Sequence, residues 1–453
     1  MKYIKDLVSL GPLIFISFLL VFTRPFVGIY IFGYRLGELI IALGFFASIS
    51  ILPIYSLNYF KKRETIFSET HLLFIGVLVT FFISLAVYGS NVLAAYTFKV
   101  SSYIWTIGYL FIILYLFKDL TVIQRYKAPV LIVFLFIPAA HYIMSTGFYP
   151  NFVIDFFKSN SDKFEFTKAS DIMLSYVVAN MINIKFTKNK NFVIFYMYFT
   201  GALLLPLLVY MSRGSFVSTF LFMLIFSLYN FDYLKENIKR TAALIISTFL
   251  VFVISTFNVN DVEINYSFSF GEAPVAEGGT LSITENISEL ARKDQQRNAF
   301  LSLYFEDGRI YSVDQTTNWR LDIWQDVFED MAKKNLLIKG YGYDEIIPVM
   351  TDPSAPGRLG RDGLNEHVHN YFVNIFARGG LFQFLLFISF HLSILYLWHK
   401  KYKDLSLILF MIPIFFNSTL DMSMEGVQYP VVYYIFLGFL INNGLSIKLN
   451  NNY

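Results

Sequence analysis

The chain has 453 residues, of which 56% are hydrophobic, 19% aromatic and only 15% charged. Soluble globular proteins contain about 25% charged residues, so this composition excludes an ordinary cytosolic enzyme and a disordered scaffold. The net charge of +3 is too small to indicate a nucleic-acid partner. The chain has no cysteine, which excludes disulfides, thiolate metal sites and a cysteine nucleophile. These features predict a polytopic membrane protein.

The apolar residues form blocks that are long enough to cross a bilayer, which takes about 20 residues per helix. They predict an all-α fold class, with one integral membrane domain over residues 1–453 and about 12 transmembrane helices. The predicted spans are 7–23, 36–55, 71–88, 92–117, 128–144, 169–186, 191–211, 214–230, 241–257, 379–398, 404–420 and 427–445. The first span follows Lys2 and Lys5 without a small-residue cleavage site, so we expect a retained helix rather than a signal peptide.

The Lys and Arg residues of the short loops indicate the orientation of these spans, because cytoplasmic loops are enriched in both. With the N-terminus in the cytoplasm, every inner loop is basic, as residues 61–63, 185–190, 235–240 and 400–403 illustrate. Both termini are then cytoplasmic. The one long hydrophilic stretch, residues 258–378, is a large outer loop between spans nine and ten, and a loop of this length usually has a function.

The outer loop contains the pattern of an amphipathic helix. From Leu321 to Met331, apolar residues recur at three- and four-residue spacing, which gives one apolar face. Asn318 is the predicted N-cap of this helix. The turn Gly340-Tyr341-Gly342 follows, and residues 365–378 are compatible with a second helix. We therefore expect the outer loop to be partly helical and to carry part of a functional site.

Charged and polar residues at the outer ends of the predicted spans form a second pattern. They are Arg24, Glu38, Lys99, His141, Asp171 and Arg213. A charge in the hydrocarbon region is costly, so it usually lines a cavity or has a charged partner. We predict a polar cavity that opens outward below the large loop; its candidate lining residues are Arg24, Arg35, Glu38, Lys99 and Asp171. For each residue alone, the alternative is an interfacial anchor or a snorkelling side chain.

Arg213 lies in Ser212-Arg213-Gly214-Ser215, between the end of one predicted span and the start of the next. A guanidinium group stays charged and pairs with phosphate oxygens in bidentate fashion. The start of the following helix offers free backbone N–H groups, and the small neighbours let a lipid headgroup approach. The pattern therefore favours an anionic ligand, and the alternative is a turn with an interfacial arginine.

A histidine-containing segment, Glu366-His367-Val368-His369-Asn370, lies ahead of Arg378. On a helix, Glu366, His369 and Asn370 would share one face. A histidine beside a carboxylate can act as a general base or orient an acceptor hydroxyl. His367 and His369 would point to different faces of a helix, so we expect no metal site. The alternative is a solvated, polar helix start.

At these residues the sequence resembles the O-antigen ligase/polymerase superfamily of bacterial envelope enzymes. One match is Ser-Arg-Gly-Ser at 212–215, which follows a long apolar helix. Another is Trp319-Arg320 with Trp324, ahead of the Gly-Tyr-Gly turn. The most specific is His-Asn-Tyr-Phe at 369–372, which continues to Ala-Arg-Gly-Gly-Leu-Phe at 377–382 and a span. The order of these motifs and the topology also match, so the resemblance covers most of the chain.

The resemblance implies an enzyme, namely an inverting, metal-independent glycosyltransferase that uses a polyprenyl-diphosphate-linked sugar donor and no cofactor. Carried over onto this sequence, it implies that Arg213 and Arg320 hold the diphosphate. It also implies that His369 lies beside the acceptor hydroxyl, with Asn370 in support. This chemistry is consistent, because arginines neutralise the charge that develops on a leaving diphosphate and a histidine can accept the hydroxyl proton.

Two further candidates come from our own interpretation of the residues: Glu366 as a catalytic group and Arg378 as a diphosphate ligand. The resemblance implies a place in the bacterial inner membrane, with the large loop in the periplasm. The implied partners are a lipid-linked oligosaccharide as donor and acceptor, the lipid bilayer and a chain-length regulator, with no nucleic acid.

Several activities stay open within the superfamily. An O-antigen polymerase joins two lipid-linked glycans, an O-antigen ligase transfers the finished glycan to lipid A core, and a protein O-oligosaccharyltransferase is a third relative. We favour the polymerase, because the outer loop is long and acidic and nothing in the sequence marks a ligase acceptor site.

Two alternatives lie outside this group. A transporter without catalysis predicts internal repeats and a pathway open to both faces, whereas we find no repeat and the membrane charges lie on one side. A metal-dependent oligosaccharyltransferase would need an acidic pair, and the sole candidate is Asp261-Val262-Glu263 beyond the ninth span.

Overall fold

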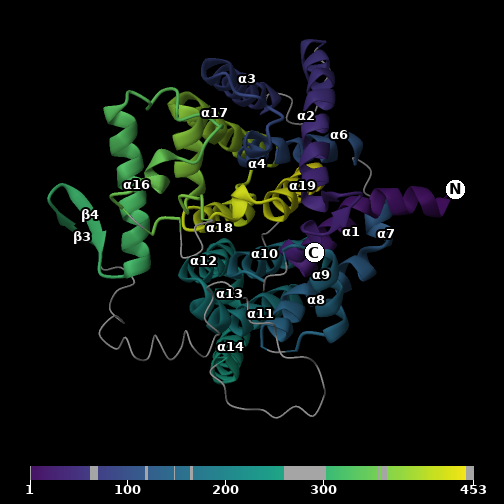
Figure 1. The fold of residues 1–453 in the computed structure, drawn as a ribbon. Coiled ribbons are helices and arrows are strands. Elements are labelled where there is room, and N and C mark those ends of the chain that lie inside the picture. Colours follow the sequence, from purple (N-terminus) through teal and green to yellow (C-terminus); the bar gives the residue numbers. More distant parts are fainter. Residues whose placement is uncertain are drawn as a thin grey trace.

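The computed structural model describes residues 2–61, 70–117, 121–146, 148–163, 167–259, 303–355, 357–359 and 365–444. Most of these residues are helical (Figure 1). In the first half the helices are α1 (Lys2–Val27), α2 (Leu36–Phe60), α3 (Thr70–Tyr88), α4 (Ala95–Val100), α5 (Ser102–Thr106), α6 (Gly108–Leu116), α7 (Thr121–Arg125), α8 (Lys127–Ser145), α9 (Asn151–Asn160), α10 (Ala169–Phe186) and α11 (Lys190–Met211). In the second half they are α12 (Arg213–Tyr229), α13 (Phe231–Glu236), α14 (Ile238–Val259), α16 (Gln315–Lys333), α17 (Tyr371–Tyr402), α18 (Ile408–Ser418) and α19 (Gln428–Asn443).

Among the described residues, seven helices are long and apolar enough to cross a membrane by length and composition. They are α1, α2, α3, α8, α11, α14 and α17. The prediction of a mostly helical, multi-pass membrane protein is therefore confirmed. The other predicted spans fall on the shorter helices α12, α18 and α19, on the polar helix α10 and on the broken run α4–α6. The count of about 12 stays a prediction.

Two helices, α10 and α19, form the centre of the membrane bundle. Every side chain from Ala169 to Ile184 of α10 and from Gln428 to Ile441 of α19 is buried. A helix that is buried on all sides belongs to the interior of a bundle. Around this centre, α19 packs against α1 and α6, and α10 packs against α8 and α12. The polar residues of α10 are accommodated in part by its own backbone, since Asn180 donates to the carbonyl of Tyr176 at 2.9 Å.

The described part of the outer loop forms a separate layer beside the bundle, made of α16 and the hairpin of β3 (Leu303–Glu306) and β4 (Arg309–Ser312) (Figure 1). A second short hairpin, β1 (Tyr30–Ile31) with β2 (Tyr34–Arg35), joins α1 to α2. The all-α prediction did not include these hairpins. Of the apolar face predicted for α16, Trp324, Val327 and Met331 belong to a small second core, whereas Phe328 is exposed.

The predicted start of the amphipathic helix in the outer loop was wrong. The helix α16 begins at Gln315 and is capped by Asp314, whose carboxylate accepts the backbone N–H of Thr317 at 2.9 Å. Asn318, the predicted cap, lies inside the helix and accepts the backbone N–H of Ser312 at 3.0 Å. Asp and Asn are both favoured as N-caps. Here Asp314 is the cap, because the Asn318 side chain is hydrogen-bonded to strand β4 of the hairpin.

The helix α17 begins before the predicted span and breaks at Gly380, which has φ 72°. The turn at Gly340 packs against this break, and the backbone N–H of Tyr341 donates to the carbonyl of Ala377 at 2.7 Å. A Cβ atom on either glycine would collide with the backbone of the facing segment. The two glycine motifs therefore allow the outer loop and α17 to meet backbone to backbone.

Candidate active site

The His369 segment is held by two tryptophans of α16. The indole ring of Trp319 lies edge-on to the imidazole of His369, with ring centroids 5.1 Å apart. The Nε1–H of Trp324 donates to the carbonyl of Val368 at 2.7 Å. The predicted motifs of the outer loop thus converge, because α16 fixes both the backbone and the ring of the histidine segment.

Residues 365–370 are not helical, so Glu366, His369 and Asn370 do not share a helix face as predicted. Asn370 is the N-cap of α17, and its side-chain oxygen accepts the backbone N–H groups of Phe372 and Val373 at 3.0 and 3.2 Å. The N-cap marks where a helix begins, so the residues before it need not have helical backbone angles. Accordingly, His369 has a left-handed backbone with φ 53°.

His369 lies in an electropositive, largely buried position. Its Nε2 is 2.9 Å from the side-chain nitrogen of Asn365. Burial lowers the pKa of His369 to about 4, and the nearby charges of Arg320 and Lys168 lower it as well. The carboxylate of Asp421 acts in the opposite direction. The imidazole is therefore neutral near pH 7 and able to accept a proton.

The two arginines of the predicted diphosphate site are linked through Asp314. The Nη1 of Arg213, at the start of α12, lies 3.1 Å from the Asp314 carboxylate. Burial lowers the pKa of Arg320, and the charges of Asp421 and Asp314 partly offset this. The Nε–H of Arg320 is buried and has no hydrogen-bond partner among the described residues. A buried donor without a partner is rare, and an anionic ligand is one group that would satisfy it.

Asp421, between α18 and α19, is a site residue that the sequence did not indicate. Burial raises its pKa, but hydrogen bonds and the charge of Lys168 outweigh burial and hold the pKa below its usual value. The hydrogen bonds include those from the hydroxyl of Ser423 and the backbone N–H of Met422, both at 2.7 Å. A lone carboxylate in a short link between two helices has no local pattern that would single it out.

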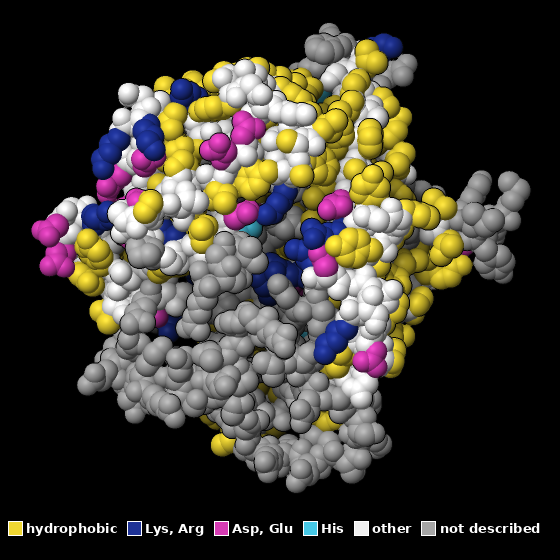
Figure 2. Space-filling view, in the orientation of Figure 1, with side chains coloured by type: hydrophobic (Ala, Val, Ile, Leu, Met, Phe, Trp, Pro, Cys, Tyr) yellow, Lys and Arg dark blue, Asp and Glu magenta, His cyan; other side chains and the backbone are white. Residues whose placement is uncertain are grey.

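Two of the predicted cavity residues, Arg24 and Asp171, interact electrostatically with each other, and Asp171 also interacts with Asp421. Asp171 is buried, interacts electrostatically with Arg24, Lys168 and Asp421, and hydrogen bonds to Gln428. Asp421 interacts electrostatically with Asp171 as well as with Arg320 and His369. Figure 2 shows Lys and Arg side chains gathered in a recess at the centre of one face, with a histidine beside them.

Lys99 and Glu366, both predicted to belong to the site, pair with each other at 2.7 Å. Next to them, Nδ1 of His367 lies 2.6 Å from the carboxylate of Glu425, which belongs to the 3-10 helix η4 (Ser423–Glu425). These two pairs attach the histidine segment to α4 and to the link before α19. Their partners could not be inferred from sequence, because each pair joins distant segments.

Arg35 and Glu38 lie in a different group. Arg35 is 2.5 Å from Asp162 and 3.9 Å from Glu38, and all three side chains are partly exposed beside the first hairpin. Among the described residues, the hydrogen bonds and ion pairs of Arg35 and Glu38 are with each other, with Tyr30 and with Asp162, and none is with His369. The structure therefore does not bring these two predicted lining residues to the histidine.

Arg378 is buried, and both of its terminal Nη groups donate to the protein, whereas its Nε–H has no hydrogen-bond partner among the described residues. It donates to the carbonyls of Gly342 and Glu345 at 3.3 and 2.9 Å, and to the hydroxyl of Tyr96 at 3.0 Å. These bonds tie α17 to the turn after Gly340 and to α4. Arg378 therefore helps to hold the outer loop against α17 and α4.

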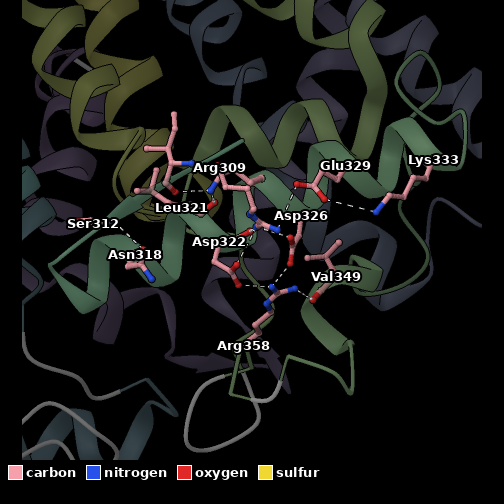
Figure 3. Close-up of polar contacts among 12 residues, drawn as sticks. Arg309, Ser312, Asn318, Leu321, Asp322, Asp326, Glu329, Lys333, Val349 and Arg358 are labelled. Carbon is pink, nitrogen blue, oxygen red and sulfur yellow. Dashed lines mark hydrogen bonds and ion pairs between the residues drawn. The ribbon is translucent and has the colours of Figure 1, made fainter. Parts of the chain in front are cut away.

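A charge cluster on α16 holds the chain that leads to the histidine segment (Figure 3). Arg358 and Arg309 point at the carboxylates of Asp322 and Asp326, and Arg358 is only 4% exposed. The carbonyl of Arg358 accepts from the side chain of Asn365, the residue next to His369 Nε2. A polar pocket of about 440 Å³ adjoins this cluster, between α16 and the 3-10 helix η3 (Pro348–Thr351), and does not include His369.

Residues 198–388 match the Wzy_C family, which is described as O-Antigen ligase. The matched region contains Arg213, Arg320, His369 and Arg378. A comparison with curated proteins finds no match. The family match supports the superfamily indicated by the sequence motifs. Together with the membrane helices, it supports a multi-pass membrane enzyme of the O-antigen ligase/polymerase type, with glycosyl transfer and lipid-linked oligosaccharide substrates.

Proposed function

We propose that this protein polymerises polyprenyl-diphosphate-linked oligosaccharide repeat units at the periplasmic face of the bacterial inner membrane, by inverting and metal-independent glycosyl transfer. The observation that carries the proposal is the grouping of Arg213 and Arg320 with His369 around Asp314 and Asp421. Two guanidinium groups suit a diphosphate, and a neutral imidazole beside them suits an acceptor hydroxyl.

In the proposed reaction the acceptor hydroxyl oxygen attacks the anomeric carbon of the donor sugar from the face opposite the diphosphate. The bond between that carbon and the diphosphate oxygen breaks, and its electron pair leaves with the lipid diphosphate. The hydroxyl proton passes to the imidazole of His369. Arg213 and Arg320 stabilise the negative charge that develops on the leaving group, which is the kind of fixed electrostatic contribution that lowers such barriers.

The donor itself would adjust His369 to this role. With a pKa of about 4, the free enzyme has a weak base. A bound diphosphate brings negative charge next to Arg320 and thereby offsets one of the causes that lower the histidine pKa. His369 then becomes a stronger base when the donor is present, so proton transfer is favoured in the complex that can use it.

Two carboxylates neutralise the basic groups of the same site when no donor is bound. Asp314 and Asp421 balance Arg213, Arg320 and Lys168 while no anionic ligand is bound. A cluster of unbalanced cations would be costly at this depth. In this proposal the diphosphate exchanges with Asp314 at Arg213, and Asp421 remains as the fixed counter-charge.

The closest competing activity is the ligase, in which lipid A core is the acceptor. Incubation of the purified protein with a defined lipid-linked repeat tests the choice. Chain growth without lipid A core is the expected result, whereas transfer only when core is added would reject the polymerase. Peptide glycosylation would favour the protein O-oligosaccharyltransferase, and export without bond formation would favour a transporter.

Metal independence is tested in the same assay. We expect activity to survive EDTA, and loss of activity that Mg²⁺ or Mn²⁺ restores would favour a metal-dependent enzyme. The acidic pair considered for that alternative, Asp261 and Glu263, lies outside the described residues. The chain-length regulator stays a proposal, which co-purification of a partner with altered product length would support.

A further inference from the structure

A cavity of about 350 Å³ lies among α11, α13 and α14, at the end of the bundle where α11 and α14 begin. The first turns of the two long helices contribute the polar residues Asn191, Arg240 and Thr241. One turn further along, the lining becomes apolar with Ile194 and Leu244. Ser247 also lines the cavity one turn beyond Leu244, but its hydroxyl donates to the carbonyl of Ala243 at 2.9 Å. The cavity is therefore polar at its mouth and mainly apolar beyond it.

The mouth of this cavity is basic. Arg240 lines it, and the ammonium group of Lys190 lies 5.6 Å from the ring centre of Tyr233, another lining residue. The hydroxyl of Tyr233 donates to the side chain of Asn191 at 3.2 Å, which fixes the ring against α11. No Asp or Glu occurs among the lining residues that the structure describes. The electrostatic character of the cavity favours an anion.

The surface next to the cavity is strongly apolar. Only 11% of the α14 span is buried inside the protein, and Ile245, Phe249 and Leu250 are exposed on it. On α11, Phe195 and Phe199 are exposed and their rings stack. Such surfaces face acyl chains in a bilayer. A basic, hydrogen-bonding mouth next to an apolar surface is complementary to a phospholipid, whose anionic phosphate lies next to its acyl chains.

We propose that this cavity binds the headgroup of an anionic phospholipid. Arg240 pairs with the phosphodiester, Asn191 and Thr241 provide hydrogen bonds, and the acyl chains lie along α14 and α11. Arg213 follows the opposite end of α11, about 33 Å away for a helix of 22 residues. The lipid site is thus separate from the proposed reaction centre and does not rest on the proposed function.

Native mass spectrometry of the detergent-purified protein tests the site, with phosphatidylglycerol, cardiolipin or phosphatidylcholine added in equal amounts. We expect Arg240→Gln to reduce the occupancy of anionic lipid about tenfold, as the loss of one charge-assisted pair predicts. Lys127→Gln is the matched control, because Lys127 is exposed at the start of α8 and does not line the cavity. It should retain the lipid.

A second variant tests the site by filling the cavity and not by removing its charge. Ala243 is exposed and lines the cavity, so Ala243→Trp should fill it and displace the lipid while Arg240 stays intact. A preference for cardiolipin over phosphatidylglycerol, or the reverse, identifies the anionic lipid. Equal occupancy in wild type and both variants, or equal binding of phosphatidylcholine, would overturn the proposal. Stabilisation by inorganic phosphate to the same extent as by lipid would also overturn it, in favour of a free-anion site.

Discussion

The guanidinium of Arg213 lies 3.1 Å from the carboxylate of Asp314, and the same carboxylate caps α16. One residue of the outer loop therefore joins the start of α12 to the helix that carries Arg320. A carboxylate offers a guanidinium much the same geometry as a phosphate. In the proposed reaction, donor binding has to exchange this internal partner of Arg213 for the diphosphate.

Replacement of Asp314 by Asn tests this exchange. Asparagine keeps a side-chain oxygen that can cap α16 and removes the charge that competes for Arg213. We expect KM for the lipid-linked donor to fall about two- to fivefold, because Arg213 is partly exposed and such pairs contribute little energy. Steady-state kinetics in lipid vesicles measures the change. An increase in KM would mean that Asp314 assists donor binding.

Arg213 itself should be indispensable. We expect Arg213→Ala to lower the rate of transfer about 100-fold or more, because the leaving diphosphate loses a fixed cation. Arg213→Lys should also fail, since an ammonium group cannot form a bidentate pair. Lys158→Ala, an exposed basic residue at the end of α9, is the control and should behave like wild type. Normal activity of Arg213→Lys in well-expressed, membrane-inserted protein would refute the bidentate role.

Local patterns were sufficient to predict most helices and to single out several residues of the candidate site. Arg213, Arg320 and His369 each belong to a short motif, and the charge network brings them together. Asp421 and Lys168 have no such motif, because their roles depend on partners from distant segments. The role predicted for Arg378 as a diphosphate ligand stays a prediction, and its hydrogen bonds to the loop after Gly340 are not visible in the sequence for the same reason.

The break of the predicted span 92–117 into α4, α5 and α6 shows another limit of sequence patterns. Ser101 marks one break, and its hydroxyl donates to the carbonyl of Thr97 at 2.7 Å while it accepts the indole N–H of Trp105 at 2.9 Å. At the start of α6, Gly108 packs so closely on the backbone of Gly44 that a Cβ atom would not fit. The Ser101 bonds are local side-chain contacts and the Gly108 contact is tertiary, and hydropathy detects neither, so it shows one continuous span.

The pH dependence of transfer tests the base assigned to His369. A base must be deprotonated to act, so activity is lost as the pH falls through the pKa of the histidine. The acid limb of kcat/KM reports the free enzyme and that of kcat reports the donor complex. Burial and Arg320 lower the pKa of the free imidazole to about 4, and the bound diphosphate should raise it. We expect the acid limb of kcat at the higher pH.

His369→Ala should abolish both limbs together with transfer, while expression and membrane insertion persist. Arg320→Gln removes one cause of the low pKa, so the residual acid limb of kcat/KM should move to higher pH. Lys333→Gln, at the exposed end of α16, is the control and should leave the limb in place. Coincident limbs of kcat and kcat/KM in the wild type would contradict the assignment of His369 as a donor-adjusted base.

The contact between the two glycine motifs should decide whether the outer loop keeps its position. Gly380→Ala places a Cβ atom against the backbone of the facing turn and forces alanine into φ 72°. Strain of this kind costs about 1–3 kcal/mol before the collision is counted. We expect a lower thermal midpoint in detergent and loss of transfer. Gly11→Ala is the matched control, because nothing lies within 4 Å of the added atom inside α1. Equal midpoints for the two variants would show that the loop and α17 do not need this close approach.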